Sequence, residues 1–325
     1  MEKRKLGFAG PEVPVLCLGG NVYGWTLQEA DAFRQLDAAL DAGMNFVDTA
    51  DVYSRWVPGH KGGESETILG KWFAKTGKRK DVILATKVGM EMGEGKKGLK
   101  PAYIRQAVED SLERLQTDYI DVYQAHKDDS DTPLEETLGA FDELVKEGKV
   151  RYIGASNYSG ARLAEALETS RKLGFTSYIS LQPHYNLVER PDFESDLLPV
   201  VEKYQLGVIP YFSLAAGFLT GKYRSKQDSE KATRGAMVQK YLNDWGFAVV
   251  AALDEVANAS GSTPARVALA WLLAQPGITA PIASATNEKQ LVDLVEATKL
   301  KLGAESIQKL NGVSVRKVPA ETVTG

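Results

Sequence analysis

The sequence lacks several features that mark other classes of protein. It has one cysteine, Cys17, so no disulfide can form within the chain, and its apolar setting predicts an inert, buried thiol. No apolar run approaches the roughly 18 residues of a membrane-spanning helix, and the start has no signal-peptide core. Lysine and arginine (39) do not exceed aspartate and glutamate (43), and no basic run is interleaved with aromatics. We therefore expect a cytoplasmic protein that binds neither nucleic acid nor membrane.

Histidine is also scarce, with three in 325 residues. No His-x-x-x-His pattern and no cluster of carboxylates at ligand spacing accompanies them. We predict no metal site.

What the sequence does have is a regular alternation of short apolar runs and segments of helical periodicity. Its hydrophobic (43%) and charged (25%) fractions are typical of a soluble globular protein, and its length suits a single large barrel. Eight strands are predicted, at 16–18, 46–50, 82–88, 120–125, 150–155, 178–182, 207–213 and 278–283. Helices are predicted after seven of them, at 27–42, 64–75, 101–115, 133–147, 159–173, 193–205 and 287–297, and none directly follows 207–213. Eight strands in this alternation predict an α/β fold, a single (β/α)₈ TIM barrel over residues 1–325.

Some segments fall outside the alternation. Residues 1–15 contain a turn signal at 9–11 and predict an N-terminal hairpin that caps one end of the barrel. Residues 217–244 form a polar insertion longer than ordinary connections, which favours a lid or a cofactor strap. Helices are also predicted at 245–261, 264–275 and 303–311, and residues 313–325 are expected to form a tail that is poorly ordered in part.

Polar residues that carry chemistry stand at the ends of three predicted strands. Asp48, Lys87 and His126 end successive strands, and Tyr53 follows Asp48 on the next loop. Parallel strands of a barrel all end at one face, so we expect these four side chains to converge there. A lysine cation beside a phenol favours phenolate, and a histidine can orient a carbonyl oxygen. No side chain supplies hydride, so the set implies a nicotinamide or similar cofactor.

These four residues, each in its local motif, resemble the catalytic tetrad of the aldo-keto reductases. The segment 144–157, LVKEGKVRYIGASN, is also close to a signature of that family, and the resemblance extends over nearly the whole chain. It implies an NADPH-dependent oxidoreductase that reduces aldehydes or ketones to alcohols. Tyr53 would donate the proton, assisted by Lys87, Asp48 and His126.

The resemblance also implies a set of cofactor contacts. In the family, residues matching Ser156, Asn157 and Gln182 hold the nicotinamide carboxamide, and the aromatic matching Tyr211 stacks on the ring. The full set it implies is Gly20, Asn21, Asp48, Ser156, Asn157, Gln182, Tyr211, Phe212, Ser213, Leu214, Gly217, Lys222, Arg224, Ser284, Thr286 and Gln290.

Two departures from the family pattern bear on the cofactor. The common Tyr-Ser-Pro-Leu of the strap is replaced by Tyr-Phe-Ser-Leu at 211–214. Ser284 and Gln290 stand where many relatives have a basic residue for the ribose 2′-phosphate, with Lys222, Arg224 and Lys289 as the alternative phosphate partners. NADPH is therefore expected, with NADH possible.

Substrate choice is less specified. Tyr23, Trp25 and Trp56 follow predicted strand ends and are expected to line the substrate site with His126. Two other functions stay open, a Schiff-base aldolase that uses Lys87 as nucleophile, and a non-enzymatic cofactor-binding regulatory subunit. The barrel is expected to be a monomer or a homo-oligomer.

Overall fold

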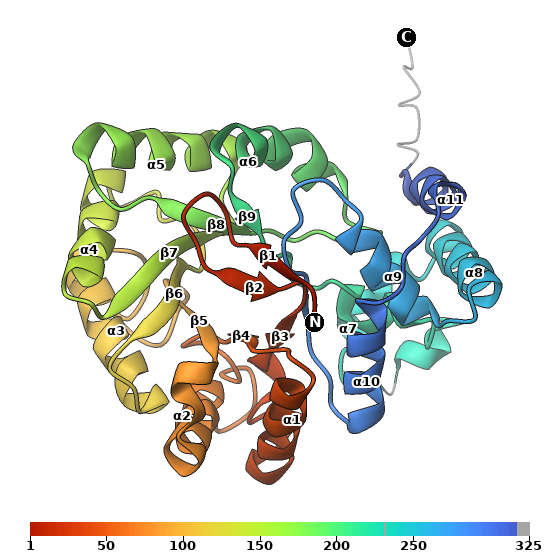
Figure 1. Cartoon of the computed structure of the whole chain (residues 1–325), viewed down its shortest axis with the longest axis horizontal. Helices are drawn as coiled ribbons and strands as arrows, with labels where there is room; N and C mark the ends of the chain where they lie inside the picture. The colour runs from red at the N-terminus through yellow and green to blue at the C-terminus, as the bar shows by residue number, and fades with distance from the viewer. Residues whose placement is uncertain (231, 317–325) are drawn as a thin grey trace.

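A closed sheet of eight parallel strands forms the centre of the molecule (Figure 1). The computed structural model describes residues 1–230 and 232–316. The strands are neighbours in the order β10-β3-β4-β5-β6-β7-β8-β9. Their bounds are β3 Cys17–Gly19, β4 Phe46–Asp48, β5 Ile83–Val88, β6 Ile120–Ala125, β7 Val150–Ser156, β8 Tyr178–Gln182, β9 Gly207–Val208 and β10 Ile282–Ala283.

Backbone hydrogen bonds between the segments of β9 and β10 close the sheet. The N–H groups of Thr279 and Ala280 donate to the carbonyl of Val208, and that of Ile282 donates to the carbonyl of Pro210. The predicted (β/α)₈ barrel is confirmed. These two strands are shorter than the sequence predicts, because Pro210 and Pro281 lack the N–H that a continued ladder needs.

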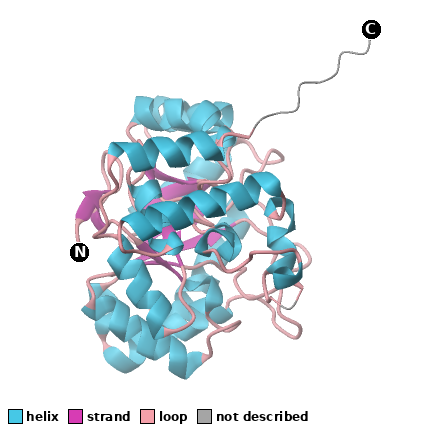
Figure 2. Ribbon diagram, turned by 90° about the vertical axis from the view of Figure 1, so that its right-hand side faces the viewer, coloured by secondary structure: helices cyan, strands magenta, loops and turns pink. Residues whose placement is uncertain are grey.

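Helices surround the sheet, as Figures 1 and 2 show. The helices that follow barrel strands are α1 Glu29–Asp41, α2 Glu64–Thr76, α3 Pro101–Leu115, α4 Leu134–Lys146, α5 Gly160–Leu173, α6 Leu198–Tyr204 and α10 Glu288–Ala297. Most bounds lie within two residues of the prediction. The predicted helix 193–205 is instead a π-helical segment, Asp192–Leu197, that continues into α6.

The N-terminal hairpin closes one end of the barrel. Strands β1 (Lys3–Lys5) and β2 (Glu12–Pro14) pair antiparallel and lie across the barrel opening in Figure 1. Leu6 and Val13 pack with the inward-facing apolar side chains of the strands, among them the fully buried Cys17. Gly7 allows this close approach, because its φ is +71° and a Cβ there would lie 2.1 Å from the carbonyl oxygen of Ile179. The predicted hairpin cap is confirmed, and this end is filled by side chains.

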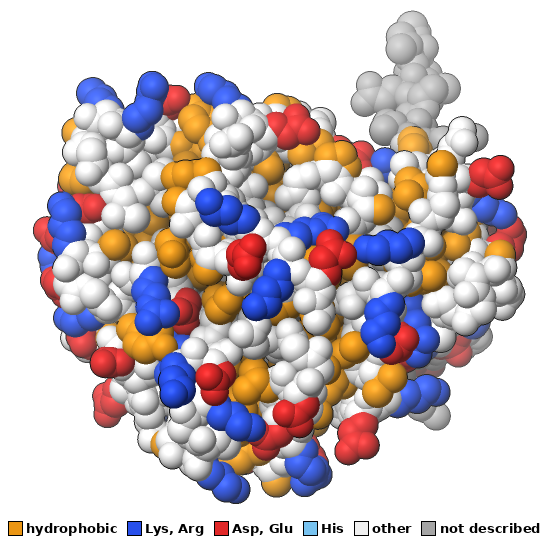
Figure 3. Space-filling view, viewed as in Figure 1, with side chains coloured by type: hydrophobic (Ala, Val, Ile, Leu, Met, Phe, Trp, Pro, Cys, Tyr) orange, Lys and Arg blue, Asp and Glu red, His pale blue; other side chains and the backbone are white. Residues whose placement is uncertain are grey.

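The hairpin face mixes charges of both signs. In Figure 3, lysines and arginines alternate with aspartates and glutamates over the same view as Figure 1. On this face no extended surface of a single sign is visible, as the near balance of acids and bases leads one to expect.

The segment predicted as a long loop is built of short helical turns. They are η4 Ala215–Thr220, η5 Gln227–Ser229, α7 Gly235–Val238 and η6 Gln239–Tyr241. Phe218, Leu219 and Tyr241 are buried, and they fix the segment against the body of the barrel. It is thus a packed strap.

Three more helices complete the chain. Helices α8 (Asp244–Ala259) and α9 (Pro264–Leu273) precede the last strand, and α11 (Ala304–Ser314) follows α10. Helix α11 is longer than predicted, so the expected tail 313–325 begins inside it, and residues 317–325 lie outside the described part. Among the described helices, none has the length and apolar character needed to cross a bilayer.

Candidate active site

Three of the four predicted catalytic side chains meet at the open end of the barrel. The Lys87 ammonium donates to Asp48 Oδ2 at 2.6 Å, to the Tyr53 hydroxyl at 2.8 Å and to the Thr49 carbonyl at 2.8 Å. The Tyr53 hydroxyl in turn donates to Asp48 Oδ2 at 3.0 Å. The phenol is therefore held between a cation and a carboxylate.

Asp48 is fully buried at the end of β4, and a set of donors offsets the cost of its burial. Besides Lys87 and Tyr53, its Oδ1 accepts from the amides of Gln182 at 2.9 Å and Gln124 at 3.3 Å. The carboxylate thus accepts hydrogen bonds from four side chains, which fix β4, β5, β6 and β8 against one another.

The electrostatic environment keeps the phenol protonated. Burial raises the pKa of Tyr53 well above its usual value, and the adjacent Asp48 carboxylate raises it further. Burial also lowers the pKa of Lys87, while the charge of Asp48 opposes that shift. At neutral pH, Tyr53 is therefore a neutral proton donor in contact with an ammonium group.

His126 lies beside Tyr53, just after β6. The two rings meet edge to face with centroids 6.1 Å apart, and the His126 backbone N–H donates to the carbonyl of Val88. Burial lowers the pKa of His126 well below its usual value, helped by the charges of Lys87 and Lys127. Its Nδ1 is buried without a partner among the described residues. A neutral imidazole of this kind has one N–H to offer a bound molecule.

Four of the predicted nicotinamide contacts form a connected group next to His126. The Asn157 amide donates to the His126 carbonyl at 2.8 Å and to Ser156 Oγ at 3.1 Å, and Asn157 Oδ1 accepts from the Tyr211 hydroxyl at 2.8 Å. Ser156 Oγ donates to the Gln182 carbonyl at 2.8 Å. These hydrogen bonds fix the end of β7, the end of β8 and the Tyr211 ring as one unit beside the catalytic group.

A second predicted group lies where β3 and β10 end. Ser284 Oγ donates to Asn21 Oδ1 at 2.7 Å, and Gln290 Oε1 accepts from the Thr286 backbone at 2.8 Å and from its hydroxyl at 3.0 Å. Gly20 permits a close approach, because a Cβ there would lie 3.0 Å from the Asp48 carbonyl oxygen. Gly20 in this group thus lies against Asp48, and the Asn157 group is bonded to His126.

The backbone between these two groups is strained. Phe212, Ala215 and Ala216 have φ of 53°, 48° and 55°, and Gly217 has φ of 95°. Non-glycine residues in this region of conformational space cost free energy and cluster at ligand sites. The Ser213 hydroxyl faces inward, donating to the carbonyls of Ile282 at 2.7 Å and Pro210 at 3.1 Å. The Ser213 hydroxyl is therefore engaged within the protein.

Comparison with known proteins agrees with this geometry. The model of the aldo/keto reductase family matches residues 15–315. The chain belongs to the aldo/keto reductase family. It is 38% identical to an uncharacterized oxidoreductase, YrpG, of Bacillus subtilis, over 96% of each chain. It is 33% identical to a probable voltage-gated potassium channel subunit beta of Oryza sativa, over 99% of each chain. It is also 32% identical to the aldo-keto reductase yakc [NADP(+)] of Schizosaccharomyces pombe, over 94% of this chain and 89% of that protein.

Membership of the aldo/keto reductase family supports an oxidoreductase that uses a nicotinamide cofactor on small carbonyl compounds. The residues present fit a nicotinamide cofactor. Hydrogen-bonding side chains sit beside the catalytic phenol, a flat aromatic ring is held next to them, and a strained backbone strap follows.

Two of the basic residues predicted to bind the cofactor phosphate differ in their contacts. Both terminal nitrogens of the Arg224 side chain donate to the carboxylate of Asp254 on α8, in a partly exposed ion pair. Lys222 folds back over Gly217, where a Cβ would lie 3.0 Å from its Nζ, and its ammonium lies 5.0 Å from the Tyr223 ring. No carboxylate lies within ion-pair distance of Lys222 in the described part of the chain.

Of the three aromatic residues predicted for the substrate site, Tyr23 is not placed as expected. Its side chain is fully buried, and its hydroxyl donates to Gln35 of α1 at 3.0 Å, so it packs behind the sheet. Trp25 and Trp56 meet edge to face at 5.5 Å, and Trp56 also lies 6.1 Å from Tyr53. Trp56 is 48% exposed, so these two tryptophans remain the predicted wall.

Two residues of the site were not predicted. Gln124, which pairs with Lys87 in register and bridges Asp48 and Gln182, is a polar residue on the inner face of β6, two positions before His126. This position in the sequence is the signal from which Gln124 could have been identified as a site residue. Arg234 of the strap lies over the Trp25 ring at 5.0 Å, a contact across more than 200 residues of sequence that no local pattern indicates.

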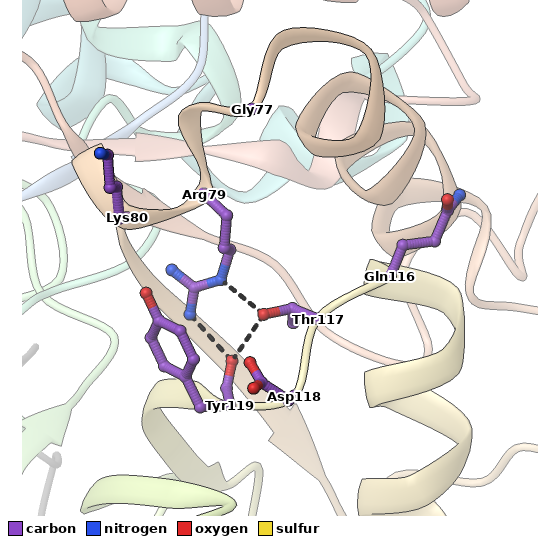
Figure 4. A pocket seen from close by; sticks show the side chains of 7 residues that line it. All are labelled: Gly77, Arg79, Lys80, Gln116, Thr117, Asp118 and Tyr119. Carbon is purple, nitrogen blue, oxygen red and sulfur yellow. Dashed lines mark hydrogen bonds between the residues drawn. The ribbon is translucent and has the colours of Figure 1, made fainter.

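A shallow cavity of about 550 Å³ lies away from this site, at the start of β5 and β6 (Figure 4). The Arg79 guanidinium in it donates to Thr117 Oγ1 at 3.2 Å, to the carbonyls of Val82 and Tyr119 at 2.9 Å and to Asp121 at 2.9 Å. Because these donors are already used within the protein, we assign no ligand to this cavity.

Proposed function

We propose that this protein reduces aldehyde or ketone groups to alcohols with hydride from NADPH. The observation that carries the proposal is the position of the Tyr53 hydroxyl, 2.8 Å from the Lys87 ammonium and 3.0 Å from Asp48, at the open end of the barrel beside His126. This is the arrangement that delivers a proton to a carbonyl oxygen while negative charge develops there.

Each residue has a distinct part in the proposed step. His126 donates a hydrogen bond to the substrate carbonyl oxygen and orients it. Tyr53 gives its proton to the same oxygen, and the resulting phenolate is stabilised by the ammonium of Lys87. Asp48 keeps that ammonium charged and in place. The bound cofactor supplies the hydride that no side chain can provide.

The cofactor would be held on both sides of the catalytic group. Ser156, Asn157 and Gln182 would bind the nicotinamide amide, and the Tyr211 ring would stack on the nicotinamide. Lys222 would contact a phosphate next to the strap. The group at the ends of β3 and β10 would offer hydrogen bonds to the ribose 2′ position, and Lys289, next to Gln290, is a candidate cation for a 2′-phosphate. We therefore expect NADPH to be preferred and NADH to be accepted.

The Schiff-base aldolase finds less support. A nucleophilic lysine needs an uncharged amine with access to a carbonyl carbon. Lys87 is fully buried, and its ammonium donates to three acceptors. This environment favours a fixed cation that does not form a covalent adduct.

A regulatory role is the second candidate. One relative that matches over 99% of each chain is named a probable potassium channel subunit beta, which favours a function for this barrel beyond turnover. The complete catalytic group favours turnover. The two functions differ in one measurable respect, since a pure binding subunit holds the cofactor without consuming a substrate.

The test combines binding and turnover on the wild-type protein. NADPH and NADH are titrated separately while the fluorescence of the five tryptophans is followed. Oxidation of the bound cofactor is then measured with a panel of aldehydes and ketones, with Tyr53→Phe as the matched control. We expect tight NADPH binding, weaker NADH binding and turnover only with Tyr53. Binding without turnover by the wild type would favour the regulatory role, and binding of neither cofactor would overturn both.

A further inference from the structure

A second group of buried polar side chains lies behind Lys87, between the sheet and helices α2 and α3. We call it the rear cluster. Its buried members are Asp51, Glu66, Thr86 and Tyr123, and the partly exposed Arg114 completes it. Thr86 and Tyr123 are opposite each other in β5 and β6, and they alternate with Lys87 and Gln124, which face the inside of the barrel. The rear cluster is therefore separated from the catalytic group by the thickness of the sheet.

Part of the rear cluster is fully paired. Glu66 Oε2 accepts from the Arg114 guanidinium at 2.7 Å, and its Oε1 accepts from the Thr86 hydroxyl at 2.5 Å. This ion pair balances its own charge, and both carboxylate oxygens of Glu66 have a donor.

Asp51 is different, although it is 1% exposed. Neither of its carboxylate oxygens has a hydrogen-bond partner in the described part of the chain, and the buried Tyr123 hydroxyl has none either. Buried polar atoms in native proteins are almost always paired, so two such groups in one cluster require an explanation.

The balance of buried charges supplies an explanation for these unpaired groups. The catalytic group and the rear cluster together contain three buried acids, Asp48, Asp51 and Glu66, and two bases. Lys87 is bonded to Asp48, and Arg114 is bonded to Glu66. An ionised Asp51 would be a buried charge without a partner, which is strongly unfavourable. A protonated Asp51 carries no charge, and its O–H and C=O are suited to a water that also serves the unpaired Tyr123 hydroxyl.

A bound cation explains the cluster less well. A hard cation needs about six oxygen ligands. Here one carboxylate and one phenol are unpaired, because both oxygens of Glu66 are engaged. The proton is the occupant that the available atoms satisfy.

Asp51 is linked directly to the catalytic residues. It lies in the short segment between Asp48 and Tyr53, and its backbone N–H donates to the Lys87 carbonyl at 3.4 Å. Its charge state acts on the Lys87 ammonium, whose pKa an ionised Asp51 raises. An anion behind that ammonium would offset part of the positive potential that Lys87 presents to the Tyr53 phenol.

We propose that Asp51 is a neutral carboxylic acid in the working enzyme, and that it is a positioning residue whose proton preserves the action of Lys87 on Tyr53. The kinetic half of this inference rests on the proposed carbonyl reduction. The neutral state of Asp51 is independent of it.

The groups that face Asp51 are consistent with this state. Burial, together with the charge of Glu66 on α2, raises the pKa of Asp51 to about 8, against the lowering effects of Arg114 on α3, the backbone N–H of Val52 and Lys87 on β5. The phenols of Tyr103 on α3 and Tyr123 on β6 also face it, and the Asp51 charge raises the pKa of each. The ionised form is expected above about pH 8, where reduction slows because the phenol becomes a weaker acid.

Stability depends on pH with a defined sign. The pKa of Asp51 is higher in the folded protein than the usual value of 3.8, so the folded state binds the extra proton between about pH 4 and about pH 8. The contribution of Asp51 to the free energy of unfolding therefore falls as pH rises through this interval and levels off above it. An asparagine at the same position has no such dependence.

The first test is spectroscopic and needs no activity. The infrared difference between the wild type and Asp51→Asn is recorded at pH 6.5 and at pH 9.5, with Asp142→Asn as the matched control. Asp142 is also buried, but hydrogen bonds to Thr176 and Lys146 lower its pKa below the usual value, so it carries no proton at either pH. We expect a protonated-carboxyl band at pH 6.5 that is lost in Asp51→Asn, retained in Asp142→Asn and lost from the wild type at pH 9.5. A wild type without the band at pH 6.5 overturns the proposal, and Asp51→Ser replaces Asp51→Asn if that variant fails to fold.

The second test is the pH profile of kcat for carbonyl reduction. Asp51→Asn is expected to move the alkaline decline upward by about half a pH unit or more, which is roughly threefold more activity at the same pH. Asp142→Asn should leave the profile unchanged. An unchanged or lowered alkaline limit in Asp51→Asn overturns the positioning role. A wild type without turnover contradicts the proposed function instead, and the infrared band then still decides the state of Asp51.

Discussion

Both ends of the barrel bury an acid beside a base, and the two pairs differ in what surrounds them. At the hairpin end, Asp121 accepts from Arg79 at 2.9 Å, from Arg151 at 2.8 Å and from the Leu84 backbone at 3.0 Å. The Tyr119 ring lies 4.0 Å from each of the two guanidinium groups. At the open end, the Asp48–Lys87 pair contacts a phenol, and the Nδ1 of His126 next to it is buried without a partner among the described residues.

This contrast indicates that the ion pair at the hairpin end stabilises the fold, while the ion pair at the open end is placed for chemistry. The pair at the hairpin end joins strands through hydrogen bonds that are complete within the protein. The pair at the open end is more deeply buried and contacts the Tyr53 hydroxyl, and the strap near it contains strained backbone. The assignment of function to one end therefore rests on what each pair contacts, since both acids are buried.

The largest difference between the ends should appear on replacing Tyr53 with phenylalanine. This change removes the proton donor and leaves the packing of the ring. We expect kcat for carbonyl reduction to fall by about 10²- to 10⁴-fold, with the Kd of NADPH changed by about twofold or less. Steady-state kinetics and the fluorescence titration measure the two quantities. A variant that keeps more than roughly a tenth of the wild-type kcat would show that another group delivers the proton.

Lys87→Met should damage both activity and stability. It removes the cation that stabilises phenolate and leaves the Asp48 charge buried without its base. The free energy of unfolding should fall by about 3–5 kcal/mol, and kcat by about 10²-fold or more.

The matched change at the hairpin end is Asp121→Asn. It weakens the hydrogen bonds to Arg79 and Arg151, so we expect about 1–3 kcal/mol of lost stability and an almost unchanged kcat. Denaturant unfolding and kinetics on both variants compare the ends directly. If Asp121→Asn lowered kcat as much as Lys87→Met, the separation of the two roles would be wrong.

The parts of the structure that the sequence predicts depend on local signals. The run into Asp48, the run into Lys87 and the run into His126 each identify a strand and its end, and barrel geometry brings the ends together. Helix bounds follow from periodicity and from turn residues such as Pro101 at the start of α3. For this reason the sequence alone was enough to predict the barrel, the hairpin and the meeting of Asp48, Tyr53 and Lys87.

The parts that were missed depend on contacts between distant segments. Arg224 is occupied by Asp254, which lies thirty residues away on α8, and Tyr23 is turned to Gln35 on α1. Neither partner belongs to a motif, so no pattern in the chain indicates them. The packed turns of 217–244 were likewise hidden, because their polar composition resembles that of an ordinary loop.

A smaller effect should separate the two basic residues of the strap. Lys222 has no carboxylate partner among the described residues, whereas Arg224 is held by Asp254. Lys222→Ala should therefore raise the KM for NADPH by about tenfold, and Arg224→Ala should change it little. Cofactor kinetics at saturating carbonyl substrate measure both. Equal effects of the two substitutions would show that Arg224 leaves Asp254 when the cofactor binds.

The smallest effect concerns the exposed aromatic rings, and it extends the comparison of the two ends. Trp56 is half exposed beside Tyr53, whereas the Tyr119 ring at the hairpin end contacts two guanidinium groups. Trp56→Ala should raise the KM for bulky ketones by about three- to tenfold and leave that for small aldehydes nearly unchanged, because only a large substrate reaches the ring. Tyr119→Leu, the matched control, should lower the melting temperature without changing either KM. Equal changes in KM for both substrate classes in Trp56→Ala would mean that the ring supports the loop that carries Tyr53, and that the substrate is bounded elsewhere.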